Sequence, residues 1–290
     1  VTGDEEVGSL SSRALIEESA RGCAAAFVLE ASADGGALKT ARKGTSDYAV
    51  TVHGRAAHAG LEPEKGANAA IELAHQILAL GEIAPSADGG AAPDGLGPTT
   101  VTPTVLSGGT TTNTVPALAG VAVDVRVPTL AAQERVDELM RALSPRIPGT
   151  RLEVSGGPNR PPLEQASSAR LFELAQRIAK DLGMEPLRGV AVGGASDGNF
   201  TAGVGCPTLD GLGAVGGGAH AVSEHVVVAE MPGRTRLLTG LIASVLGGEP
   251  SAGEAATEAT ISGEAGAGRI SPPASEGSAA AGEPPEEDGR

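Results

Sequence analysis

The sequence predicts an α/β protein in which an α+β domain of the ferredoxin-like kind is inserted into a larger α/β domain. The first observation is the order of elements between residues 48 and 155, which reads strand, helix, strand, strand, helix, strand. The second is the apolar run of residues 24–29, which is typical of a buried strand. The third is an amphipathic helix over residues 171–182, where the larger domain resumes.

The inserted domain is expected to begin with a half-buried strand at residues 48–53 and a helix at 63–81. The apolar stripe of that helix is predicted to comprise Ala67, Ala70, Ile71, Ala74, Ile77 and Leu78. Strands follow near 99–106 and 119–127, then a helix at 130–143 and a strand at 150–155. In the second of the middle strands, alternation predicts one buried row, namely Val121, Val123, Val125 and Val127.

The larger domain is assigned to residues 1–46 and 157–246, and the inserted domain to residues 47–156. A helix is expected at 8–20 with Ser9 as its cap, a strand near 207–209 and a closing helix at 229–246. Ser196 or Asp197 is expected to cap a further helix. Residues 247–290 hold nine acidic residues and two arginines with almost no large apolar side chain, which predicts a disordered acidic tail.

Charge and composition exclude several classes of function. A net charge of −15 argues against a nucleic-acid partner, which would require a basic face. No apolar run is long enough to cross a membrane, and a cytoplasmic location is expected. Cys23 and Cys206 are predicted to be buried free thiols. Because the acidic triplet described next lies at the very start of the chain, an N-terminal part is expected to be missing.

The triplet Asp4-Glu5-Glu6 could serve a metallohydrolase. Adjacent side chains point in different directions, so one glutamate could bind a metal while the other takes a proton from a neighbouring water. Taken alone, the triplet is more typical of a helix N-terminus than of a metal site. Glu30 ends the apolar run and is either a solvated strand end or a site residue, since ligand-binding groups gather at the carboxyl ends of strands in open α/β sheets. His58 and His220 lie among small residues that would let a substrate approach, although each could also be an ordinary loop histidine.

Seven short motifs in this order resemble one enzyme family. They occupy residues 2–9, 28–30, 54–60, 113–116, 124–126, 193–197 and 218–220. On these motifs the chain resembles the dinuclear zinc carboxypeptidase and aminoacylase family (metallopeptidase family 20), which includes succinyl-diaminopimelate desuccinylase and acetylornithine deacetylase. The resemblance covers residues 1–246 and is greatest to the glutamate carboxypeptidase branch. It implies a zinc-peptidase-like catalytic domain, incomplete at its N-terminus, and an inserted domain that forms a homodimer.

The resemblance also implies roles in catalysis and metal binding. Glu5 would be the general base that deprotonates a metal-bound water. Glu6 and His220 would bind one zinc ion, and Glu30 would bind the other; cobalt or manganese could replace zinc. His58 would reach the active site of the partner subunit and stabilise the oxyanion.

Three further residues are implied in substrate binding. Asn113 would support the oxyanion, Arg160 would bind the free carboxylate of the substrate, and Arg126 would support that site. The expected reaction is hydrolysis of an amide or peptide bond next to a free carboxylate, with a small peptide or an N-acyl amino acid as substrate. Two further metal ligands of the family, a histidine and a bridging aspartate upstream of the triplet, are absent from the chain. Two alternatives therefore stay open: an N-acyl-amino-acid deacetylase, and a catalytically incompetent fragment or homologue that retains only dimerisation.

Overall fold

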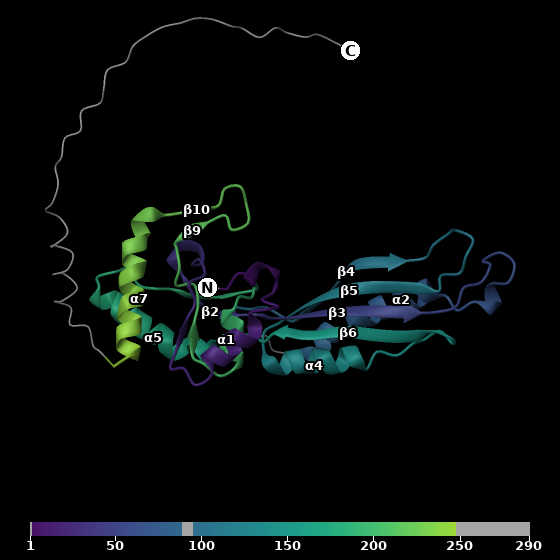
Figure 1. Ribbon diagram of the computed structural model, residues 1–290, viewed down its shortest axis with the longest axis horizontal. Helices are drawn as coiled ribbons and strands as arrows, with labels where there is room; N and C mark the ends of the chain where they lie inside the picture. Colours follow the sequence, from purple (N-terminus) through teal and green to yellow (C-terminus); the bar gives the residue numbers. More distant parts are fainter. Residues whose placement is uncertain (1, 89–94, 248–290) are drawn as a thin grey trace, which may run out of the picture. The chain divides into compact units, whose positions relative to one another are not determined.

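A computed structural model describes residues 2–88 and 95–247 and contains both expected parts of the α/β fold (Figure 1). The predicted tail at 247–290 lies outside these residues apart from Gly247. Within the described ranges, none of the helices combines the length and the apolar character that a membrane span requires.

The inserted domain is a four-stranded antiparallel sheet with strand order β4-β5-β3-β6. Its strands are β3 (Gly44–His53), β4 (Thr100–Gly108), β5 (Leu118–Val127) and β6 (Arg151–Arg160). The helices α2 (Ala69–Gly81), α3 (Ile83–Ala87) and α4 (Leu130–Arg141) complete it, after a single 3-10 turn, η3 (Pro63–Lys65). The chain order and strand order together confirm the predicted ferredoxin-like arrangement.

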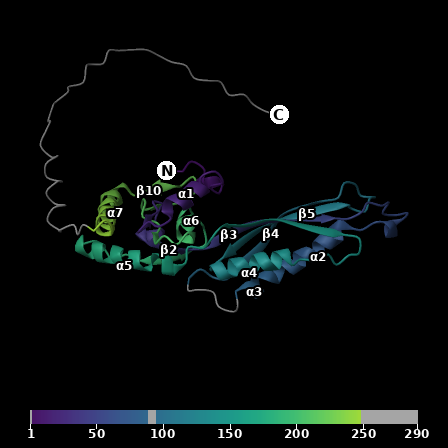
Figure 2. The same ribbon diagram turned by 60° about the horizontal axis from the view of Figure 1, so that its bottom comes forward.

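The core of this domain lies between the sheet and its helices. Figure 2 shows α2 and α4 on one side of the strands. The valines of β5 that the alternation predicted to be buried are all 3% exposed or less. They pack with Tyr48, Val50 and Val52 of β3 and with Val136 and Met140 of α4. The period-two burial of β5 therefore follows directly from its sequence.

The predicted buried stripe of α2 is wrong for Ala70, Ile71, Ala74 and Leu78, which are exposed, whereas Ala67 is buried and Ile77 packs against the core. The helix instead buries Ala69, Glu72, Leu73, Gln76 and Leu80. Two residues that were expected in the core are exposed, Ile71 at 54% and Leu78 at 70%. The helix is rotated because Glu72 and Gln76 face inward and hydrogen-bond each other and the backbone of residues 144–147. A hydrophobic pattern assigns such polar side chains to the solvent face.

The larger domain contains short parallel pairs of strands. Strand β1 (Ala26–Phe27) pairs with β8 (Thr208–Leu209), and β2 (Leu38–Arg42) pairs with β7 (Gly189–Val192). A hairpin is formed by β9 (Gly216–Gly217) and β10 (His225–Val226). The helices are α1 (Arg13–Ala20), α5 (Gln165–Asp181), α6 (Gly198–Gly203) and α7 (Met231–Val245), with the 3-10 turns η1 (Glu5–Val7), η2 (Asp34–Gly36) and η4 (Val228–Glu230).

A second core holds this domain together. Helix α5 packs on β2 and β8, and α7 packs on α5. The fully buried leucines of this core are all 1% exposed or less, namely Leu38, Leu171, Leu209, Leu237 and Leu241. Two expectations fail near the N-terminus. The helix predicted at 8–20 begins only at Arg13, after the separate 3-10 turn η1. Ser9 does not cap it but is fully buried with a positive φ of 53°. Both cysteines are free as expected, but Cys23 is exposed and only Cys206 is buried.

Candidate active site

Glu5 lies on a tightly folded turn at the start of the described chain. Its neighbour Asp4 accepts hydrogen bonds from the hydroxyl groups and backbone N–H groups of Ser11 and Ser12. These hydrogen bonds hold the pKa of Asp4 far below its usual range, and the bond from the Ser11 hydroxyl contributes most. Gly8 ends η1 in the left-handed region, with φ +91°. The turn therefore presents Glu5 in a defined position although the segment is short.

Arg160, the last residue of β6, is the hub of the site. It is only 8% exposed. Its Nη2 donates to Glu5 Oε1 at 3.0 Å, to Ser9 Oγ at 3.1 Å and to Asp197 Oδ1 at 3.2 Å. The guanidinium also lies over the ring of Phe200, with 5.2 Å from Cζ to the ring centroid. Arg160 thus binds groups of its own chain, on the N-terminal turn and at the start of α6.

The environment of Glu5 favours a carboxyl group that takes up protons readily. Partial burial raises the pKa of Glu5, while the Arg160 guanidinium acts in the opposite direction. The carboxylates of Glu30, Asp197 and Glu6 raise the pKa further, so several acidic groups lie near one another here. A carboxylate with a raised pKa is a better general base near neutral pH than an ordinary glutamate.

The three predicted metal ligands lie on three different segments. Glu6 is exposed on η1, and Glu30 is half-buried after β1. His220 is exposed near the turn of the β9–β10 hairpin and has a φ of +63°. Gly213 accommodates the Glu30 segment, because a Cβ at residue 213 would lie 2.7 Å from the Glu30 carbonyl oxygen. Within residues 2–88 and 95–247, no three histidine, cysteine, aspartate or glutamate side chains are grouped so as to hold a metal ion.

His58 and Asn113 lie together in two adjoining loops of the inserted domain. His58 forms an isolated antiparallel bridge with Thr114, and the Ala59 N–H donates to the Asn113 carbonyl at 2.8 Å. Both side chains are exposed. The His58 ring accepts a hydrogen bond at Nδ1 from the Gly60 N–H at 3.2 Å. This contact holds the ring in place and leaves Nε2 directed away from it.

Arg126 has a partner of its own. Strand register places Arg126 of β5 and Arg160 of β6 on either side of Thr45 of β3. The Arg126 guanidinium nevertheless forms a forked ion pair with Asp124, with Nη2 to Oδ2 at 2.7 Å. The hydrogen bond to Asp124 raises the pKa of Arg126. Arg126 and Arg160 therefore flank Thr45 from opposite sides and contact different carboxylates.

Sequence reasoning did not predict that Ser9 and Asp197 contact Arg160. Asp197 makes no capping hydrogen bond to α6. Its carboxylate instead accepts from Thr2 Oγ1 at 2.8 Å and from the Ser9 hydroxyl, besides Arg160. The signal that could have identified these residues was their presence in the motifs at 2–9 and 193–197. Ser196, the other candidate cap, donates to Asp210 at 2.6 Å and accepts from the Gly198 N–H.

Comparisons with known proteins identify relatives of the chain. Residues 40–149 match the family model of the peptidase dimerisation domain named M20_dimer. Over 249 residues the chain is 29% identical to carboxypeptidase G2 of Pseudomonas sp. (strain RS-16), which covers 82% of this chain and 57% of that protein. The chain therefore spans little more than half the length of this relative.

Solved structures show the same fold. The aminopeptidase PepT of Bacillus cereus ATCC 10987 matches with a TM-score of 0.60 and 25% identity, over 84% of this chain and 63% of that one. The YXEP protein of Bacillus subtilis, described as a dinuclear metal-binding peptidase of the M20 family, matches with a TM-score of 0.55 and 15% identity, over 83% and 63% of the two chains.

Proposed function

We propose that the chain is a peptidase of the M20 type and serves in the hydrolysis of an amide or peptide bond next to a free carboxylate; its matches to the M20 dimerisation domain and to M20 peptidases support this. The observation that carries the proposal is the Glu5–Arg160 pair within a cluster of acidic groups. The substrate would be a small peptide or an N-acyl amino acid. The corresponding cellular location would be the cytoplasm.

Glu5 is proposed as the general base that takes the proton of the attacking water and later gives it to the leaving amine. Its raised pKa and its fixed turn support this role. Arg160 holds the Glu5 carboxylate and Asp197 at one guanidinium. It is a positioning residue in this arrangement. We also predict that Arg160 binds the substrate carboxylate and that Arg126 supports this binding.

Zinc is the metal implied by the resemblance, with cobalt or manganese as alternatives, and Glu6, Glu30 and His220 are the proposed ligands. The described side chains do not fit a complete site, because they form no group of three possible ligands. A zinc site with so few protein ligands would bind the ion weakly. No step of the reaction is therefore assigned to a metal here.

His58 and Asn113 are proposed to act across a homodimer. Both side chains are exposed, and their loops are joined by the His58–Thr114 bridge, so they could enter the active site of a second copy together. There they would donate hydrogen bonds to the developing oxyanion.

A second candidate function is dimerisation without catalysis. Two observations favour it. The four-stranded sheet of the dimerisation domain is complete, and the described residues contain no group of three possible metal ligands. In this case the protein would assemble as a dimer and hydrolyse nothing.

The experiment is an assay of the 290-residue protein with zinc, cobalt or manganese added. The substrates are a dipeptide, the N-acetyl derivative of an amino acid with a free carboxylate, and the carboxamides of both. The proposal predicts that the parent protein hydrolyses a substrate with a free carboxylate and that Glu5→Gln abolishes this hydrolysis. The control Glu18→Gln, on the exposed side of α1, should leave it unchanged. Preference for the dipeptide or for the acetylated substrate separates peptidase from deacetylase. A dimer without turnover would support the second candidate instead.

A further inference from the structure

A cavity of about 520 Å³ lies on the strand pair β2–β7, outside the Arg160 cluster. Its wall is formed by the loop after β1, by two residues of β2 and by β7 with its flanking residues. The charged members of the lining are Asp34, Lys39, Arg42 and Arg188. The lining thus carries three cations against one carboxylate.

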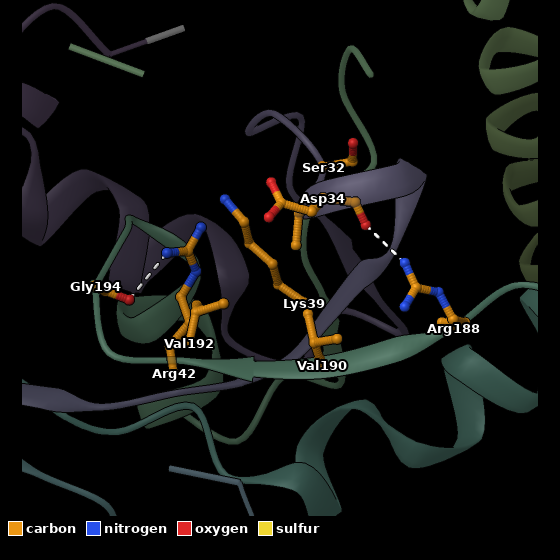
Figure 3. A pocket seen from close by; sticks show the side chains of 9 residues that line it. Ser32, Asp34, Lys39, Arg42, Arg188, Val190, Val192 and Gly194 are labelled. Atoms are coloured by element: carbon orange, nitrogen blue, oxygen red, sulfur yellow. Dashed lines mark hydrogen bonds between the residues drawn. The ribbon is translucent and has the colours of Figure 1, made fainter. Parts of the chain in front are cut away.

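An irregularity in β2 brings two of these cations together. Lys39 and Arg42 are three residues apart, so a regular strand would direct their side chains to opposite faces. The β2–β7 register shifts between Lys39 and Ala41, and this extra residue returns Arg42 to the face of Lys39. Figure 3 shows the two side chains extending side by side into the cavity, with Arg188 on the opposite side.

The three cations differ in their partners. Arg42 donates from Nε to Asp210 at 2.7 Å and from Nη1 to the Gly194 carbonyl at 2.9 Å, and its side chain is 5% exposed. Within residues 2–88 and 95–247, Arg188 donates to a neutral acceptor alone, the Asp34 carbonyl, at 2.9 Å. Among the described residues, the Lys39 amino group has neither a hydrogen-bond acceptor nor an ion-pair partner.

Lys39 is therefore a partly buried cation next to a second cation and without a counter-charge in contact. Burial, and then the nearby Arg42 guanidinium, lower the pKa of the Lys39 amino group, although the Asp210 and Glu30 carboxylates act in the opposite direction without contacting it. Such an arrangement costs stability in the empty protein and is relieved by a bound anion. The Ser32 hydroxyl, also in the lining, is buried and has no hydrogen-bond partner in the part of the chain that the structure describes.

The remaining lining selects among anions. Ala33, Val190 and Val192 supply an apolar surface beside the cations. Inorganic phosphate would leave that surface unfilled, whereas a carboxylate attached to a short aliphatic group would contact both parts. We propose that this cavity binds a small aliphatic carboxylate between Lys39 and Arg188. The proposal does not rest on the hydrolytic function of the Glu5 site.

The test is a calorimetric titration of the 290-residue protein with butyrate, with the uncharged isostere butyramide and with inorganic phosphate. Butyrate should bind saturably and more tightly than either of the other two. Lys39→Met, which keeps the length of the side chain, should weaken butyrate binding about tenfold or more, because a charge-assisted hydrogen bond is lost. Arg188→Gln should weaken it less, since Arg188 is exposed and its charge is screened.

The matched control is Lys180→Met, which removes an exposed lysine of α5 outside the cavity and should leave butyrate binding unchanged. Thermal melting separates binding from folding: without ligand, Lys39→Met should melt no lower than the parent protein, because it removes an uncompensated charge. The proposal is overturned if butyrate does not bind, if butyramide or phosphate binds as tightly, or if Lys39→Met binds butyrate as the parent does.

Discussion

The Arg160 guanidinium donates to the Glu5 carboxylate at 3.0 Å across 155 residues of sequence. Arg160 ends β6 in the inserted domain, whereas Glu5 belongs to the N-terminal turn. The position of the proposed base therefore depends on how the end of β6 is fixed. That end is held from the other side by Gln133 of α4, whose buried Nε2 donates to the Arg160 carbonyl at 3.0 Å.

Gln133→Ala is expected to lower the free energy of unfolding by about 2 kcal/mol, because it leaves buried acceptors unpaired. Besides the Arg160 carbonyl, Nε2 donates to the Thr45 carbonyl at 3.0 Å and to Ser46 Oγ at 3.2 Å. Urea unfolding measures the change. Gln165→Ala, at an exposed position of α5, is the control and should change stability by less than about 0.5 kcal/mol. Equal effects of the two substitutions would contradict the assigned role of Gln133.

Gly156→Ala is expected to be strongly destabilising, by about 3 kcal/mol or more, because two penalties coincide. Gly156 has a φ of +84°, and a Cβ there would lie 2.1 Å from the Asp47 carbonyl oxygen of the paired strand β3. Gly183 has a comparable φ of +66° but no atom near its Cβ position. Gly183→Ala should thus cost only about 1 kcal/mol, the backbone penalty alone. Chemical denaturation of both variants tests the difference, and similar losses would refute the proposed clash.

Glu72→Gln is expected to destabilise the inserted domain by about 2 kcal/mol near neutral pH. Although burial acts to raise the pKa of Glu72, hydrogen bonds from Gln76 and from the N–H groups of Ile147 and Arg146 lower it overall. A carboxyl group with a lowered pKa stabilises the fold above its unfolded pKa, and this contribution is lost as the pH falls through the folded value. The melting temperatures of parent and variant should therefore differ at pH 7 and converge under acid conditions. A difference that does not shrink in acid would show that the ionised carboxylate is not responsible.

The sequence predicted the inserted domain well because its pattern is local. The alternating valines of β5 and the inward Met140 of α4 follow from strand and helix periodicity alone. The face of α2 could not be predicted, because Glu72 is buried by hydrogen bonds to a loop that lies more than seventy residues away in sequence. Hydrophobicity carries no signal for such a contact.

The candidate site was predicted in part. The motifs identified Glu5 and Glu30, and the family resemblance identified Arg160. The structure brings Arg160 into contact with Glu5, and Glu30 lies close enough to affect the pKa of Glu5. The burial of Ser9 and the attachment of Asp197 to Arg160 depend on the packing of segments distant in sequence. Local rules assigned both residues to helix caps, since their side chains suit that role equally well.

Leu78→Glu tests the homodimer proposed for the dimerisation domain. Leu78 and Ile71 are 70% and 54% exposed on α2, which packs beside the edge strand β4. That strand also exposes Val105 and Leu106, at 68% and 59%. An unpaired strand edge next to exposed apolar side chains is typical of a surface that a second copy covers. Light scattering after size exclusion should give a dimer for the parent protein and a monomer for Leu78→Glu, because a buried unpaired charge opposes association. Leu15→Glu, at a 65% exposed position of α1, adds the same charge elsewhere and should remain dimeric. A parent protein that is monomeric at all concentrations, or a Leu78→Glu variant that stays dimeric, would contradict this interface.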